Sequence, residues 1–519
     1  MGENLIGFYE KNVKKEWKIA FWSAFILCLL VHLYKFGNTL INHDSLYNVY
    51  SPQNIVASGR WFLRYACGIS SYFDLPWLNG LLSTLYLALA AGFIAALFDL
   101  KNPVVIVLSS AILAASPCTT ETFFFSYTAD GYMMGLMFSA AAAVLICKTE
   151  KLRFWVLGGV LICLATGIYQ SCLSFAMLLS AAWLVLELLS ERKSVKQAWA
   201  WIGKNVLLYG AALAAYYIIW KLALHFYGLA AVSYQGIDNV GRVGFSTIIH
   251  GAIDSVANLL LLLIERNFFK YPITPYTLFN LIWMAAFIGI LIAALIKSKA
   301  VRKASRLLTV LVILGACVPV LSIWEFTSDT VYYRPMMLHG VCVFYILSLI
   351  LFDRWAKPGK STVFGLFMAA VVFNFAIVAN ISYFYMEKSY EKTYYMGSQM
   401  MNEIEQLCAE QEEPISSIAI LGDRHEAASL VNTYPAAKAQ IVVRYLEQDI
   451  LLDSDHAYLV LENLFGLKLP QATTEQLEAL ARDPAIQALP AWPNRDCMTI
   501  VDNVLVVVMS PLDVQSGNR

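Results

Sequence analysis

The sequence predicts a helical bundle that crosses a membrane many times, followed by a small soluble α/β domain. Of the 519 residues, 59% are hydrophobic and only 14% are charged, whereas soluble domains average about 25% charged residues. Apolar stretches of about 20 residues, enough for a helix to cross a bilayer, recur through the first three quarters of the chain. Residues 386–519 instead have the composition of a soluble domain.

We expect a short N-terminal segment, residues 1–16, and then eleven membrane-spanning helices within residues 17–385. Several of these stretches are shorter than a perpendicular crossing needs, which is tolerated where a helix lines a cavity enclosed by protein. The third and fourth spans are the best candidates for such a cavity. The predicted spans are 17–36, 75–98, 104–117, 131–148, 154–170, 172–189, 205–226, 275–296, 307–324, 337–352 and 362–385.

The distribution of basic residues predicts the orientation. Lys and Arg in one set of alternate loops outnumber those in the other by roughly three to one, and the basic set belongs in the cytoplasm. The N-terminus is then cytoplasmic and residues 386–519 lie outside. The predicted outer loops are 37–74, 117–130, 227–274 and 325–336.

One stretch of the third outer loop has its own helical periodicity. Ser246–Phe269 places polar residues among leucines at helical spacing. A helix of this kind is typical of the membrane interface, so we expect it to lie there or against the bundle rather than to form a twelfth span.

The soluble domain has signals for both helices and strands. Glu391–Glu412 and Thr473–Arg482 read as helices, and Ile415–Leu421 and Asn503–Met509 read as strands. These elements predict a small α/β domain. Gly422–His425 follows a predicted strand, where a simple turn explains it as well as a site does.

The ten cysteines include no CxxC pair, so no zinc or redox motif is present. Cys408 and Cys497 share the soluble domain and could form a disulfide. His43 and His339 have no ligand spacing, and we expect no metal. The net charge of zero gives no reason to expect a nucleic-acid partner.

Carboxylates at the outer face are the first candidate site residues. Asp44 follows the first span directly, within Asn42–Leu46. A partly buried carboxylate there would suit a general base, although a helix-cap or loop role also fits. Glu121, Asp130 and Glu325 are candidates for substrate binding on other outer loops.

Cations on the same face are candidates for binding phosphate, which arginine holds with two parallel hydrogen bonds. Arg60 and Arg64 are four residues apart, as on one helix face, and suit either phosphate or lipid headgroups. Arg334 beside two tyrosines suits either a phosphate ligand or an interface anchor. The candidates are Arg60, Arg64, Arg266, Lys270 and Arg334.

A tight turn between the fifth and sixth spans holds Tyr169 and Gln170. These two side chains are candidates for substrate binding if they line a cavity. Closing the turn is an equally good interpretation.

The combination fits glycosyl transfer from a polyprenyl-phosphate sugar. The leaving phosphate needs cations, and the acceptor hydroxyl needs a carboxylate base. A transporter or flippase of lipid-linked sugars is an alternative, but it would want ionisable residues near the bilayer midplane. A polysaccharide polymerase or ligase shares the expected site and is not separated from a single-sugar transferase. A structural or receptor role also stays open.

The chain resembles the glucosyl transferase II (GtrII-type) family of the GT-C class of membrane glycosyltransferases. The resemblance covers about residues 15–385. Four passages carry it: Asn42-His43-Asp44, Gly59-Arg60-Trp61, Ser116-Pro117 with Glu121 before Phe123–Ser126, and Gly167–Ser171.

The resemblance implies the details of the reaction. GT-C enzymes place an essential acid in the first outer loop, which maps onto Asp44. The implied donor is undecaprenyl-phosphate glucose, and the implied acceptor is a surface polysaccharide or glycolipid at the outer face of a bacterial inner membrane. Transfer is implied to invert the anomeric carbon. Some GT-C enzymes use a divalent cation, but no cofactor is expected here. Residues 386–519 match no family pattern, which leaves the acceptor open.

Overall fold

The computed structural model describes residues 13–49, 51–68, 73–232, 244–264, 273–326, 334–355, 358–422, 450–451 and 453–512. The chain divides into two compact units. The membrane unit comprises residues 1–38, 51–380 and 442–446, and the C-terminal unit comprises residues 39–50, 381–441 and 447–519. Residues 39–50 are thus separated in sequence from the rest of the unit to which they belong.

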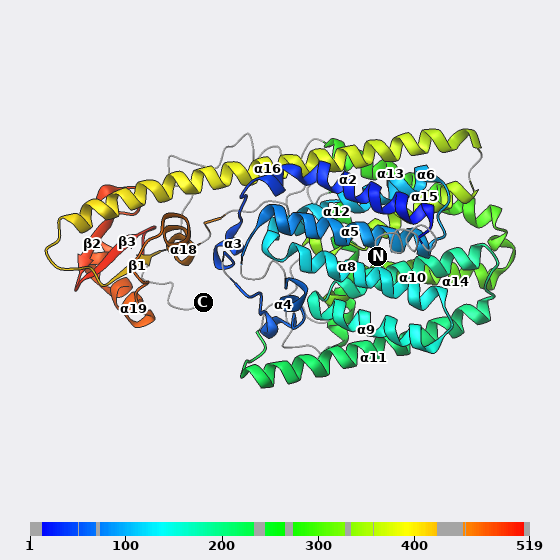
Figure 1. The fold of residues 1–519 in the computed structure, drawn as a ribbon, viewed down its shortest axis with the longest axis horizontal. Coiled ribbons are helices and arrows are strands. Elements are labelled where there is room, and N and C mark those ends of the chain that lie inside the picture. The colour runs from blue at the N-terminus through cyan, green and yellow to red at the C-terminus, as the bar shows by residue number, and fades with distance from the viewer. Residues whose placement is uncertain are drawn as a thin grey trace, which may run out of the picture. The chain divides into compact units, whose positions relative to one another are not determined.

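The membrane unit is helical throughout its described part (Figure 1). Each of the eleven predicted spans coincides with a helix, which confirms the predicted helical membrane bundle. The long helices are α2 (Lys15–Gly37), α5 (Pro76–Leu97), α6 (Pro103–Ala115), α8 (Ser126–Lys148), α9 (Leu152–Ile168), α10 (Cys172–Leu189), α11 (Val195–Tyr227), α12 (Phe245–Ile264), α13 (Pro275–Lys297), α14 (Ala304–Leu321), α15 (Val341–Trp355) and α16 (Pro358–Ala409).

Nine helical runs in the described residues are long and apolar enough to cross a membrane. The difference from eleven has a simple origin. Helices α6 and α8 belong to one run, Pro103–Lys148, and α9 is a shorter apolar helix. Helix α15 has only 15 residues. Helix α12 is counted among the nine, although the sequence favours an interfacial helix there.

Helix α12 buries one narrow stripe against α13 and α14. The stripe includes Gly251, Ser255 and Asn258. Its other faces expose apolar side chains such as Ile253 and Val256. Ser246, His250 and Asp254 are exposed as well, so the surface of this helix mixes polar and apolar side chains, as the surface of an interfacial helix does. Its interfacial orientation stays a prediction.

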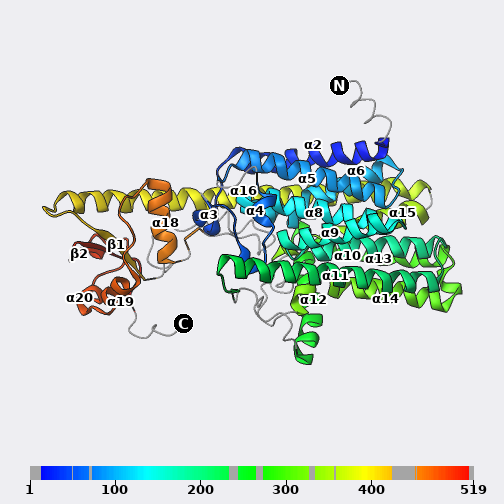
Figure 2. The same ribbon diagram turned by 60° about the horizontal axis from the view of Figure 1, so that its bottom comes forward.

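Helix α8 is central in the membrane unit, where it packs against α5, α9 and α10 (Figure 2). The segment leading into it was expected to be an outer loop, 117–130. It instead forms α7 (Pro117–Thr122), η2 (Phe123–Phe125) and the start of α8, and all of these residues are buried. Ser116 caps α7, accepting a hydrogen bond from Thr119 N at 3.3 Å, and Pro117 follows at the first helical position. This pairing of cap and proline restarts a helix.

Five further short elements complete the described part of this unit, three of them in its second half. These three are η4 (Ala300–Arg302), η5 (Ile323–Phe326) and η6 (Pro335–Met337). Two others, η1 (Val56–Ser58) and α4 (Leu63–Ala66), follow residue 51. Phe62 N donates to Gly167 O at 2.9 Å, where a Cβ on Gly167 would lie 2.7 Å from the Trp61 ring. Glycine at 167 therefore lets the Gly59–Phe62 segment reach the end of α9.

The C-terminal unit is the predicted α/β domain. Its sheet has the order β1 (Ser417–Leu421), β3 (Val504–Val508), β2 (Met498–Val501), with β1 parallel and β2 antiparallel to β3. The two predicted strands and the helix α19 (Thr474–Arg482) are confirmed. Strand β2, the helices α18 (Ser454–Phe465) and α20 (Pro484–Gln487), and η9 (Arg495–Cys497) were not predicted.

The strands alternate between two hydrophobic layers. Ile418, Ile420 and Leu505 face a core shared with α18 and the end of α16. Ala419 and Val506 face the opposite side, toward α19 and α20. The predicted helix Glu391–Glu412 is the last part of α16, which continues without a break from the last predicted span. Cys408 and Cys497 are free thiols, so the suggestion of a disulfide between them is wrong.

Residues 39–50 complete the first of these cores. They form α3 (His43–Tyr47), and Ile41 and Leu46 are buried with Ile404, Tyr458 and Leu461. The segment directly after the first predicted span is therefore a structural part of the C-terminal unit.

Candidate functional site

Asp44 lies on a short helix that its neighbours hold in place. Asn42 Oδ1 accepts a hydrogen bond from Ser45 N at 2.9 Å, and Asn42 N donates to Ser45 Oγ at 3.1 Å. This reciprocal pair is a capping box, which satisfies two backbone N–H groups at the start of α3. Asn48 Nδ2 donates to the carbonyl oxygen of Asp44 at 2.7 Å. The cap is thus Asn42, and the carboxylate of Asp44 is not used for capping.

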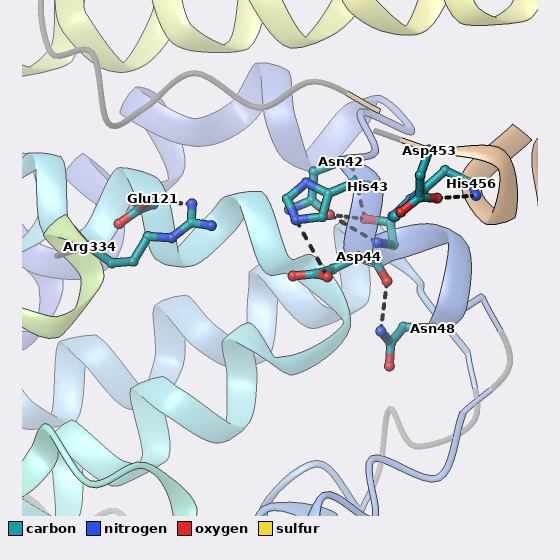
Figure 3. Close-up of polar contacts among 9 residues, drawn as sticks. Asn42, His43, Asp44, Asn48, Glu121, Arg334, Asp453 and His456 are labelled. Atoms are coloured by element: carbon teal, nitrogen blue, oxygen red, sulfur yellow. Dashed lines mark hydrogen bonds and ion pairs between the residues drawn. The ribbon is translucent and has the colours of Figure 1, made fainter. Parts of the chain in front are cut away.

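The Asp44 carboxylate is accessible. Its side chain is 45% exposed, and Oδ1 lies 3.5 Å from Nε2 of His43 (Figure 3). The carboxylate is therefore partly buried, as expected, but it is open to solvent, because α3 turns Ser45 and Leu46 rather than Asp44 into the core.

Helix α18 packs against α3 within the C-terminal unit. Asn463 Nδ2 donates to Leu46 O at 2.9 Å. The ring of His456 meets the Tyr47 ring at 5.2 Å, edge to face, and the His43 ring at 5.9 Å. His456 in turn hydrogen-bonds Asp453 through Nδ1 at 2.6 Å. Asp453 and His456 were missed, since an Asp three residues before a His at a helix start reads only as an N-cap.

Three carboxylates influence Tyr47. Burial raises the pKa of its hydroxyl, and the negative charges of Asp453, Asp455 and Asp44 raise it further. The surroundings of α3 are therefore aromatic and negative, which suits contact with hydroxyl-rich or neutral molecules better than with anions.

In the membrane unit, Glu121 and Arg334 form an ion pair. Glu121 Oε1 lies 3.6 Å from Arg334 Nη1, and Oε2 accepts a hydrogen bond from Met336 N at 2.7 Å. Figure 3 shows the two side chains pointing toward each other; the Glu121 side chain is fully buried, whereas that of Arg334 is 31% exposed. Glu121 was expected to contact substrate. Its side chain is closed to solvent, whereas that of Arg334 remains accessible.

A second cation, Arg60, lies among aromatic rings. Its Nη1 donates to the Tyr132 hydroxyl at 3.1 Å, and its guanidinium lies 5.0 Å from the centre of the Tyr169 ring. Tyr132 and Tyr169 stack at 4.6 Å. Gln170 Nε2 donates to Ser58 O at 2.8 Å and to the Tyr216 hydroxyl at 3.2 Å. The predicted residues Arg60, Tyr169 and Gln170 are therefore brought together at the turn between α9 and α10, with Tyr132 as an unpredicted partner.

Arg60 and Arg64 do not share a helix face as predicted. Arg60 precedes α4, whereas Arg64 is half-buried within it. Helix α4 begins only at Leu63, after a turn at residues 61–62, so the helical continuity that the four-residue spacing suggested is absent.

Asp130 lies near the start of α8 rather than in a loop. It is only 1% exposed, and its Oδ1 accepts a hydrogen bond from Gly131 N at 3.0 Å. Burial raises the pKa of the neighbouring Cys67 thiol well above its usual value, and the charge of Asp130 adds to this effect. Asp130 is better placed to support the protein than to meet substrate directly.

A buried polar group next to α8 was also missed. Ser126 Oγ donates to Asp74 Oδ2 at 3.1 Å, and Lys35 Nζ lies 3.5 Å from the same oxygen of Ser126. Burial raises the pKa of Asp74, while the charge of Lys35 opposes the shift. Lys35 ends the first predicted span, where a charge reads as an interfacial anchor.

The side chains of three predicted residues have no described position. Arg266 and Lys270 lie outside the described residues, and Glu325 belongs to η5, but its side chain is not described. Among the residues that the structure describes, no group of three or more His, Cys, Asp or Glu side chains could hold a metal ion.

Comparison with known proteins gives one match. The family described as Glucosyl transferase GtrII matches residues 33–352, more than half of the chain. No curated protein and no solved structure matches the chain.

Proposed function

Because the chain belongs to the glucosyl transferase GtrII family, we propose that it transfers glucose from a polyprenyl-phosphate donor to a polysaccharide or glycolipid at the outer face of a membrane. The family supports glucosyl transfer, and the apolar helices support a multi-pass membrane protein. The donor, the acceptor and the side of the membrane are our proposal.

The state of Asp44 is the observation that carries this proposal. A general base needs an accessible carboxylate held in a fixed place. Asn42 and Ser45 fix the backbone of α3, and the Asp44 side chain is nearly half exposed. In the proposed step, the acceptor hydroxyl gives its proton to this carboxylate as its oxygen bonds to the anomeric carbon of glucose. The bond from that carbon to the phosphate oxygen breaks on the opposite face, which inverts the configuration.

The leaving phosphate gains negative charge and needs cations rather than an acid. Arg334 is the leading candidate, because Glu121 holds it while part of its guanidinium stays accessible. Arg60 is the second candidate, and its fixed place over Tyr169 supports this role. Arginine suits both positions because its planar group can donate two hydrogen bonds to one phosphate.

A transfer assay with the full-length protein in nanodiscs tests the base. The donor is radiolabelled polyprenyl-phosphate glucose, and the variant is Asp44→Asn. Loss of a general base lowers turnover by about 10²–10⁴-fold, so label should move with the wild type only. Asp502→Asn is the matched control, since it makes the same change at an exposed turn of the same unit.

Full turnover by Asp44→Asn would remove Asp44 as the base. No turnover by folded wild-type protein would instead contradict the proposed donor. The control should behave as the wild type does, which separates loss of the base from a general effect of removing a negative charge.

A further inference from the structure

The C-terminal unit holds the helix that carries Asp44. Ile41 and Leu46 are buried in its core, and Asn463 of α18 donates to the carbonyl oxygen of Leu46 at 2.9 Å. Residues 39–50 therefore take their conformation from residues that follow them by about four hundred positions in the sequence. A domain that only follows the membrane helices in sequence would not need to pack on residues 39–50.

Within α18, Asp453 fixes the orientation of His456. Asp453 Oδ1 accepts hydrogen bonds from both the backbone N–H and the Nδ1–H of His456, at 3.0 and 2.6 Å. Two bonds to one carboxylate oxygen set the position and the ring plane of this histidine. Its side chain is only 7% exposed.

The fixed ring of His456 faces two aromatic residues of α3, His43 and Tyr47, which lie on the same short helix as Asp44. It contacts the Tyr47 ring edge to face at 5.2 Å, and the His43 ring lies 5.9 Å away. His43 in turn places Nε2 3.5 Å from Asp44 Oδ1. The ring of His456 has a second nitrogen, Nε2, that is buried and has no hydrogen-bond partner in the described part of the chain. Burying an unpaired polar atom costs free energy, which a purely space-filling residue would avoid.

We propose that Asp453 and His456 are positioning residues for the Asp44 carboxylate, which they reach through His43 and Tyr47. This inference rests on the proposed role of Asp44 as the base. It gives the C-terminal unit a direct part in transfer, because its helix α18 sets the geometry of the reacting carboxylate. A misplacement of about 1 Å can lower a rate by about 10²-fold, so a residue that never touches substrate can matter this much.

Two variants of His456 separate positioning from filling. His456→Phe keeps a ring against Tyr47 but loses the ring hydrogen bond to Asp453. His456→Asn keeps a donor for Asp453, since its amide nitrogen replaces Nδ1, but loses the ring. Positioning requires both features, so each variant should lower kcat by about 10–100-fold, with the KM for donor unchanged. A space-filling role predicts full activity for His456→Phe, and that result would overturn the proposal.

The same changes in the Asp44→Asn background complete the test. If His456 acts only through Asp44, its replacement there should cause no further loss. An equal fold loss in both backgrounds would mean that His456 acts elsewhere, and would also overturn the proposal. Tyr458→Phe is the control, because it removes the hydroxyl hydrogen bonds of another α18 residue, to Glu462 and Leu469, and keeps the ring in the core. It should leave kcat unchanged.

Hydrogen exchange of the full-length protein in nanodiscs gives a readout that needs no substrate. Backbone amides in residues 42–48 should exchange about tenfold faster in both His456 variants, because α3 loses a fixed neighbour. They should not change in Tyr458→Phe. Unchanged exchange in both His456 variants would contradict positioning even if the donor were misassigned. Failure of the proposed donor would appear separately, as inactivity of the wild type.

Discussion

At the residue scale, the pairing of Glu121 with Arg334 joins two side chains that were expected to act separately. Glu121 is buried and bonded to Met336 N, so it cannot leave to contact a sugar. Its charge lies 3.6 Å from Arg334, a distance that suits electrostatic attraction rather than a hydrogen bond. The Arg334 side chain stays 31% exposed, so a ligand can reach it, as a phosphate site requires.

Arg334→Ala should raise the KM for a polyprenyl-phosphate donor by about 10–100-fold, the loss expected for charged hydrogen bonds. The KM for acceptor should change little. Glu121→Gln keeps an acceptor for Met336 N but removes the negative charge beside Arg334. It should therefore also raise the KM for donor, by less than Arg334→Ala does. Steady-state kinetics with each substrate varied in turn measures both values.

Arg302→Ala is a suitable control for this comparison, because it removes an exposed cation from the same unit. It should leave both KM values as they are in the wild type. An unchanged donor KM in Arg334→Ala would reduce Arg334 to an interface anchor, the alternative that its neighbouring tyrosines allow.

The sequence predicted several site residues at this scale but not their partners. Asp44, Arg60, Tyr169, Gln170 and Arg334 could be proposed, because an isolated charge or a tight turn is visible in a linear pattern. Partners such as Tyr132 and His456 are set by long-range packing, for which no local spacing exists. Local chemistry did contain one answer that was not used: Asn42 three residues before Ser45 is a capping box, which assigns the cap to Asn42.

At the element scale, helix α18 begins at a cap that depends on charge. Partial burial alone would raise the pKa of Asp453, but hydrogen bonds from the N–H and ring of His456 outweigh it and hold that pKa below its usual value. A carboxylate with a lowered folded-state pKa stabilises the fold above its unfolded-state pKa, about 3.9. This stabilisation is lost as pH falls below that value and through the folded-state pKa.

The start of α18 should therefore be less stable in acid than at neutral pH. Amides in residues 454–458 should exchange faster, after correction for intrinsic rates, as pH falls below about 4. Asp453→Asn keeps an oxygen that accepts both bonds but cannot titrate, so this acid-dependent increase should be smaller. A pH response of equal size in the variant would show that another group controls the helix.

Elements were predictable where the pattern was long and local. The predicted spans and the strands β1 and β3 have strong apolar patterns, and each was found. Residues 117–130 were expected as a loop because Pro117, two threonines and Glu121 interrupt the apolar run. In the fold these residues are buried against protein, and Ser116 with Pro117 starts a new helical turn. The amphipathic end of α16 was predicted as a separate helix, because the composition changes from apolar to mixed near residue 386. The helix itself continues through this change.

At the scale of the whole molecule, the C-terminal unit draws on two distant parts of the chain. Its core combines Ile41 and Leu46 with side chains from the last quarter of the sequence. Composition predicts a domain as one continuous stretch, so residues 39–50 were assigned to an outer loop. Residues 39–50 and the C-terminal domain must lie on the same side of the membrane, because they form one core. The predicted outer loop and the predicted outer domain both meet this requirement.

This shared core strengthens the prediction for orientation. Basic loops place the N-terminus in the cytoplasm and the end of the chain outside. In intact spheroplasts, protease should therefore digest an epitope tag after Arg519 and spare a tag before Met1. Lysis should expose both tags, which controls for resistance of either one. Immunoblots with the two tag antibodies measure the outcome. Digestion of the N-terminal tag alone in intact spheroplasts would reverse the orientation and place Asp44 in the cytoplasm, where an outer-face acceptor could not reach it.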